Sequence, residues 1–124
     1  NKYIILFFLL ASYFLPAKSI SESKLKNIRY YFYTGIDNEE YLDSLDLYLT
    51  RILKDSKNQD YALLIAYRGA GISVRAVHAF WPISKLNYVK DGLVDLDYAV
   101  KKDPENIEVR FLRFSVLDNL PGIL

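Results

Sequence analysis

The sequence contains no cysteine and a single histidine, and it carries almost no net charge. The absence of cysteine excludes disulfides, thiol catalysis and cysteine-ligated metal sites. Catalytic triads and most transition-metal sites use an imidazole, so any such site would have to include His78. The nearest neighbours of His78 are apolar, and we expect it to form a hydrogen bond near a helix end. We therefore expect neither an enzyme nor a protein with a metal or another cofactor.

One long apolar run is present, at the start of the chain. Lys2 precedes the apolar residues 3–15, which are followed by Pro16 and by the triplet 17–19, small at both ends. This order is typical of a secretory signal peptide, with cleavage after Ser19. A membrane-spanning helix needs roughly 20 apolar residues, so we expect no stable span after cleavage. An uncleaved anchor and a core helix of the folded domain are the alternatives.

Removal of this leader leaves a nearly neutral domain, residues 20–124. Without Lys2 and Lys18, the 16 basic residues become 14 against 15 acidic ones, a net charge of −1. This balance gives no electrostatic basis for binding nucleic acid or an anionic membrane. About 105 residues form one domain with one core. An exported protein without disulfides suits the periplasm or the outer membrane of a Gram-negative bacterium.

Helical periodicity runs through nearly all of the remaining chain, and the alternation typical of strands is missing. It predicts an all-α fold of about five helices in antiparallel pairs. The first pair is expected within residues 21–57, the second within 60–103, and a final helix within 104–120.

Glycine, proline and capping residues mark the expected helix ends. Gly35 is expected to end the first helix in the left-handed conformation. Pro82 separates the third and fourth helices, and Ser84 is expected to cap the fourth. Asp103 is expected to cap the fifth helix, with Pro104 as its first residue.

A stripe of small residues follows one side of the third helix: Ala62, Ala66, Gly69, Ala70 and Ser73. Small side chains allow a neighbouring backbone to come close. A glycine inside a helix costs roughly 1 kcal/mol relative to alanine, so close packing against the fourth helix is the expected compensation.

The fourth helix resembles the second helix of a tetratricopeptide repeat. The family's small, large, alanine and proline positions are matched in spacing by Gly92, Leu96, Ala99 and Pro104, and the small position of its first helix by Gly69. The chain thus resembles a degenerate, exported bacterial member of this family over residues 60–120. The resemblance implies a right-handed stack of helix pairs with a scaffolding or protein-binding role and no catalysis. Two departures are a longer turn at residues 78–84 and Phe114 in place of a glycine.

Aromatic residues are the remaining candidates for a binding site. Those that we expect to contact a protein or peptide partner are Tyr30, Tyr31, Tyr33, Tyr67, Trp81 and Tyr88. Aromatic side chains are favoured at interfaces, although they also wedge between helices with their hydroxyls at the rim. The alternative function is small-ligand or glycan binding, in a pocket near residues 78–88 lined by His78, Trp81 and Tyr88.

The final helix has no second helix with which to pair. It carries the apolar residues Ile107, Phe111, Phe114 and Leu117, and Pro121 and Gly122 follow it. Because a repeat depends on its neighbours or on a cap to cover its apolar side, we expect exposed apolar surface here. Further chain, a second copy forming a homodimer through this helix, or a docked partner would cover it.

Overall fold

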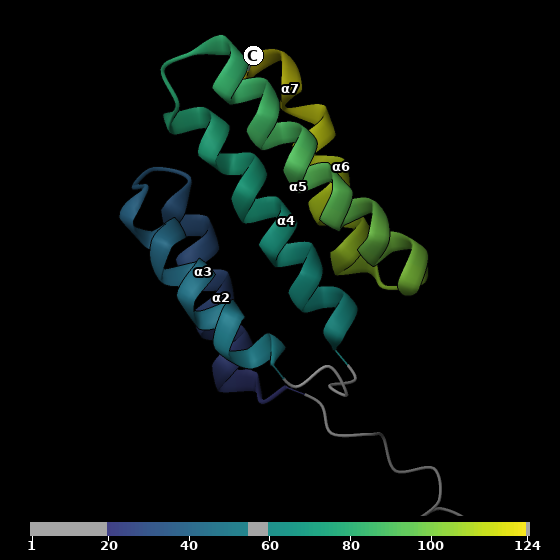
Figure 1. Ribbon diagram of the computed structural model, residues 1–124. Helices are drawn as coiled ribbons and strands as arrows, with labels where there is room; N and C mark the ends of the chain where they lie inside the picture. Colours follow the sequence, from purple (N-terminus) through teal and green to yellow (C-terminus); the bar gives the residue numbers. More distant parts are fainter. Residues whose placement is uncertain (1–19, 55–59, 124) are drawn as a thin grey trace, which may run out of the picture.

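The computed structural model in Figure 1 describes residues 20–54 and 60–123. Each regular element within these residues is a helix: α2 (Glu22–Gly35), α3 (Glu40–Leu53), α4 (Tyr61–His78), α5 (Pro82–Lys102), α6 (Ile107–Asp118) and the single turn α7 (Leu120–Ile123). The predicted all-α fold is therefore confirmed. The predicted leader, residues 1–19, lies outside the described residues, as do residues 55–59, which include the last three residues of the predicted first pair.

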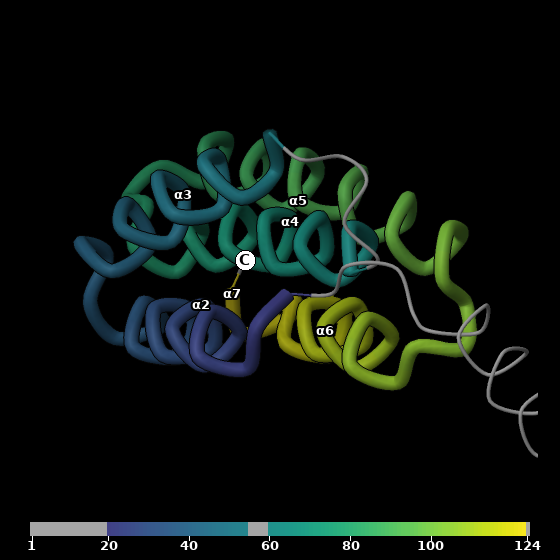
Figure 2. Tube along the Cα trace, turned by 90° about the horizontal axis from the view of Figure 1, so that it is seen from below, coloured from purple at the N-terminus to yellow at the C-terminus, as the bar shows by residue number. Residues whose placement is uncertain are grey.

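The helices form two rows, with α3, α4 and α5 in one row and α2 and α6 in the other (Figure 2). Each long helix packs against the next along the chain, and α4 also packs against both α2 and α6. The arrangement is repeat-like, because α2 with α3 and α4 with α5 form two successive antiparallel hairpins (Figure 1). Helix α4 is the central element of the fold.

The central position of α4 follows from its sequence, which is apolar on nearly every side. Its buried residues include the unbroken run from Ala62 to Tyr67, and a helix that is apolar all round needs neighbours all round. The other helices each contribute one buried stripe, such as Leu42, Leu45 and Leu49 from α3.

The predicted close contact between α4 and α5 is confirmed. A Cβ atom added to Gly69 would lie 2.5 Å from the carbonyl oxygen of Gly92 and 2.7 Å from Cβ of Asp95. A Cβ atom on Gly92 would lie 2.8 Å from the amide nitrogen of Ser73. Such distances are too short for real atoms, so this crossing requires glycine on both helices. Ala99, also on α5, is fully buried.

The prediction that Gly35 adopts the left-handed conformation is wrong. Among the described residues no backbone φ is positive, and Gly35 is the last helical residue of α2. It is buried beside Leu42, whose Cγ would lie 2.8 Å from an added Cβ. Glycine is therefore needed here for the close approach of α3 and not for a left-handed turn.

Two expected helix starts are also corrected. Helix α5 begins at Pro82 itself, so Ser84 lies inside the helix, and only residues 79–81 connect it to α4. The predicted long turn is thus short. The amide of Asp103 still donates to the carbonyl of Ala99, 3.0 Å away, so Asp103 ends α5 and cannot cap the next helix. Pro104 lies in the turn that follows.

The cap of α6 is Asn106, whose side-chain oxygen accepts a hydrogen bond of 3.1 Å from the amide of Val109. Asparagine is among the best N-cap residues. The chain thus reverses over residues 103–106, and α6 begins at Ile107, three residues after its predicted first residue, Pro104.

Candidate functional site

Two of the predicted partner-binding aromatics lie in the seam between α2 and α3. The Tyr30 ring meets Tyr41 edge-on with centroids 5.7 Å apart, and the Tyr31 ring meets Tyr48 at 5.8 Å. Tyr30 remains 55% exposed, whereas Tyr31 is partly buried. At Tyr30 and Tyr31 these contacts favour packing between helices over binding of a partner.

Tyr67 does not belong to the partner-binding set, because it is completely buried. Its ring packs edge-on against Phe32 with centroids 5.6 Å apart, and its hydroxyl donates to Oε1 of Glu108. Arg29 holds the same carboxylate with two hydrogen bonds of 2.9 and 2.8 Å. The cluster of Arg29, Tyr67 and Glu108 therefore fastens α2, α4 and α6 together.

The ionisation of this cluster is fixed by its contacts. The hydrogen bonds from Arg29 lower the pKa of Glu108, and burial together with the hydrogen bond to Glu108 raises the pKa of Tyr67. The hydrogen bond to Glu108 raises the pKa of Arg29 in turn. At neutral pH the carboxylate is thus charged between a charged guanidinium and a neutral phenol, which suits a structural tie.

His78 has the role expected from its apolar neighbours. Its Nε2 donates to the backbone carbonyl oxygen of Gly35, 2.8 Å away at the end of α2. Trp81 is 65% exposed in the turn between α4 and α5, where it meets Phe80 edge-on at 5.0 Å. Tyr88 is partly buried on α5.

Two large hollows lie among the described residues, and neither of these two is lined by His78, Trp81 or Tyr88. The first, which we name the concave cleft, lies between α2 and α6 over the second half of α4. It has a volume of about 440 Å³, and Gly122 and Ile123 of α7 form part of its lining. Of the predicted candidates it includes only Tyr33, which is 48% exposed. The apolar side chains that line it are Phe32, Ile36, Val74, Val77, Phe111, Leu112, Val116 and Ile123.

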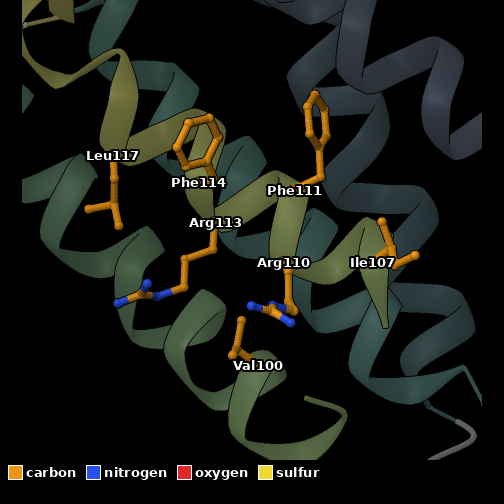
Figure 3. A pocket seen from close by; sticks show the side chains of 7 residues that line it. All are labelled: Val100, Ile107, Arg110, Phe111, Arg113, Phe114 and Leu117. Carbon is orange, nitrogen blue, oxygen red and sulfur yellow. The ribbon is translucent and has the colours of Figure 1, made fainter. Parts of the chain in front are cut away.

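The second hollow lies on the outer side of α6 and has a volume of about 560 Å³ (Figure 3). Three of its large apolar lining residues are strongly exposed, with exposed fractions of 82% for Ile107, 53% for Phe111 and 61% for Phe114. We name these three residues the outer stripe. The expectation of exposed apolar surface on the final helix is therefore confirmed.

The core side of α6 is formed by a different set of residues, Val109, Leu112 and Val116, all of them buried. Helix α6 is thus apolar on two opposite sides, and only one of them is covered by the described residues. Sequence reasoning named the outer-stripe residues but missed the core set. Both sets repeat at helical spacing within residues 107–116, and that double pattern was the available signal.

Arginines line the edge of the outer stripe that faces α5. In Figure 3 the side chains of Arg110 and Arg113 extend toward α5, and the ring of Phe111 points the other way. Nε of Arg113 donates to Oδ1 of Asp97 on α5, 2.7 Å away. Arg110 is exposed and forms no ion pair with any described residue. The stripe therefore has one unneutralised cation at its rim.

Within residues 20–54 and 60–123, no group of three or more His, Asp or Glu side chains could hold a metal ion. Crossing a bilayer would take a longer or more apolar helix than any in these two ranges. Comparison with family models, with curated proteins and with solved structures finds no match for this chain.

Proposed function

We propose that this chain is a non-catalytic protein-binding module of the bacterial envelope, which receives its partner on the outer stripe of α6. The observation that carries the proposal is the exposure of Ile107, Phe111 and Phe114 side by side on one helix. Full burial of one such side chain contributes about 1.5–3 kcal/mol. Contiguous exposed apolar patches with a polar rim are typical of interaction sites.

The order of helix contacts supports a degenerate tetratricopeptide-like stack. Each long helix packs on the next, and α4 also packs on both α2 and α6. The close crossing of Gly69 and Gly92 lies at the positions that carry the resemblance to that family. A right-handed sense of the stack and a location in the periplasm or at the outer membrane are parts of the same proposal, and the location rests on the leader.

A variant of the outer stripe tests the proposal. Ile107→Ser with Phe114→Ser removes most of the apolar surface without touching the core or the concave cleft. The matched control is Leu47→Ser with Val94→Ser, because these side chains are similarly exposed, at 61% and 68%, on other helices.

The measurement is co-purification of envelope proteins with the tagged full chain, together with thermal melting of each variant. We expect one protein to be retained by the wild type and by the control, and to be lost by the stripe variant at unchanged melting temperature. Equal retention by all three proteins would refute binding through the stripe.

The concave cleft favours a second candidate function, the binding of a small apolar ligand. Its volume of about 440 Å³ lies within the range of ligand pockets, roughly 300–1,000 Å³. Its lining is mainly apolar, with polar groups from Ser73, Ser115, Asn119 and the hydroxyl-bearing Tyr33. This site replaces the predicted pocket at residues 78–88 as the place where a ligand would bind.

A further inference from the structure

We infer that the element seated on the outer stripe is an amphipathic helix of a partner protein, antiparallel to α6, with a carboxylate side chain that pairs with Arg110. The inference rests on the proposed function and adds the form and the charge of the partner. It follows from a comparison of α6 with α2 and α4, each of which is the first helix of an antiparallel hairpin.

Helices α4 and α6 share one register. The buried residues Leu64, Tyr67 and Gly71 of α4 have the same spacing as the buried residues Val109, Leu112 and Val116 of α6, at a constant offset of 45 residues. By the same offset, the three residues of the outer stripe are equivalent in position to Ala62, Ala66 and Gly69 of α4. That side of α4 is the one that crosses α5 at Gly69.

Helix α2 repeats the relation. Its buried residues Leu25, Ile28 and Phe32 precede those of α4 by a constant 39 residues. The residue of α2 equivalent to Gly69 is Tyr30, whose ring packs against Tyr41 of α3. In both hairpins the antiparallel second helix therefore contacts this side of the first helix, closely at Gly69 of α4 and only partly in α2, where Tyr30 remains 55% exposed.

Helix α6 presents the same side without such a cover among the described residues. The short α7 cannot serve, because its residues Gly122 and Ile123 line the concave cleft. The element that fits the stripe is thus a helix in the position that α3 and α5 hold in their own pairs. Bulky Phe111 and Phe114 replace Ala66 and Gly69 here, so this helix must offer small residues between its larger apolar ones.

The positive charge of Arg110 at the rim favours a partner helix that carries a carboxylate. Across the equivalent seam, Arg68 of α4 pairs with Asp95 of α5 through hydrogen bonds of 2.7 and 2.9 Å. The residue of α6 at the same register as Arg68 is Arg113, which is already held by Asp97. Arg110 is left to pair with an incoming carboxylate.

A second copy of the chain fits this rim less well. A two-fold axis that pairs α6 with an antiparallel α6 brings the same edge of both helices to the same side of the interface. Arg110 and Arg113 of both copies would then lie together, and like charges across an interface are unfavourable. An acidic partner helix avoids this repulsion.

Two designed peptides serve as probes for the full-length protein. Both are 20-residue Ala- and Leu-based amphipathic helices with the same apolar stripe, and they carry either Glu or Lys at the rim position facing Arg110. Fluorescence anisotropy measures their binding. We expect the Glu peptide to bind at least about tenfold more tightly than the Lys peptide, and the preference to weaken with added salt because exposed charges are screened.

Charge reversal tests the role of Arg110 directly. Arg110→Glu should invert the preference between the two peptides, whereas Arg51→Glu, at an exposed arginine on α3 without an ion pair among the described residues, should leave it unchanged. Equal binding of both peptides, or no inversion in Arg110→Glu, would overturn the inference.

The outcome is separable from that of the proposed function. If neither peptide binds while Ile107→Ser with Phe114→Ser still abolishes retention of an envelope protein, the stripe is a binding site but its occupant is not an acidic helix. If sedimentation shows a dimer of the wild type that this double variant converts to a monomer, the occupant is a second copy, and the inference is also overturned.

Discussion

Replacement of Gly92 by alanine should destabilise the fold despite the better helix propensity of alanine. Propensity alone would stabilise α5 by about 1 kcal/mol. The new methyl group, however, would collide with Ser73 and with the carbonyl oxygen of Gly69. Overpacking of a tight core costs about 1–3 kcal/mol, and two of the three atoms involved belong to the α4 backbone and cannot rotate away. The upper end of that range is therefore expected, giving a net loss of about 2 kcal/mol.

Thermal unfolding followed by circular dichroism measures this loss. For a domain of roughly 100 residues, 1 kcal/mol corresponds to about 4–8 °C, so the melting temperature should fall by about 8–16 °C. Two other glycines provide matched controls. A Cβ atom on Gly71 would meet only Cδ2 of Leu45, at 2.9 Å, and one on Gly122 would meet no atom within 4 Å.

Gly71→Ala should change the melting temperature little, because the end of a leucine side chain can rotate. Gly122→Ala should leave it equal or slightly higher. A Gly92→Ala protein as stable as the wild type would refute the reasoning, since the α4–α5 crossing would then not depend on the absence of a side chain.

Three further substitutions test individual contacts. Glu108→Gln should lower the free energy of unfolding at pH 7 by about 1–2 kcal/mol. Because Arg29 lowers the pKa of Glu108 in the folded state, the wild type should lose this advantage as the pH falls below the ordinary carboxyl range. Urea titrations at pH 7 and pH 3 measure the difference between the two proteins, and a difference that stays constant would contradict this reasoning. His78→Ala removes the hydrogen bond to the Gly35 carbonyl and should cost about 1 kcal/mol, with faster amide exchange where α2 ends; unchanged exchange would argue against this contact. Ser73→Ala removes a fully buried hydroxyl that has no hydrogen-bond partner and should be neutral or stabilising by up to about 1 kcal/mol in urea unfolding, so a clear destabilisation would reveal a partner for it.

The helices could be predicted from the sequence because the signals that form them are local. Apolar spacing identified five long segments, and small residues at helical intervals identified the α4–α5 crossing. Helix ends were less accurate, since capping depends on the path of the turn. Asp103 and Asn106 are both good cap residues, and only the continuing hydrogen bond from Asp103 to Ala99 decides between them.

The site could be predicted only in part. Exposed apolar surface on the final helix followed from an unpaired helix in a repeat-like chain. The burial of Tyr67 could not be foreseen from the sequence. Its partner Glu108 lies 41 residues after Tyr67 in the chain, and Arg29, which binds the same carboxylate, lies 38 residues before Tyr67. Contacts over such separations depend on how helices stack, and the helical period of a single segment does not contain that information.

The two candidate sites share one residue, and this determines which variants separate them. Phe111 lines both the concave cleft and the hollow over the outer stripe, so its removal would weaken either function. Phe114 lines only the outer hollow, and Val77, which is 46% exposed, lines only the cleft. If the module binds a protein through α6, Phe114→Ser should abolish partner retention and Val77→Ser should not. If an apolar ligand in the cleft is the physiological one, binding of a fluorescent fatty-acid probe should show the opposite dependence. A protein in which both variants lose partner retention equally would mean that the partner spans α6 from the stripe into the cleft, and that the two sites form a single surface.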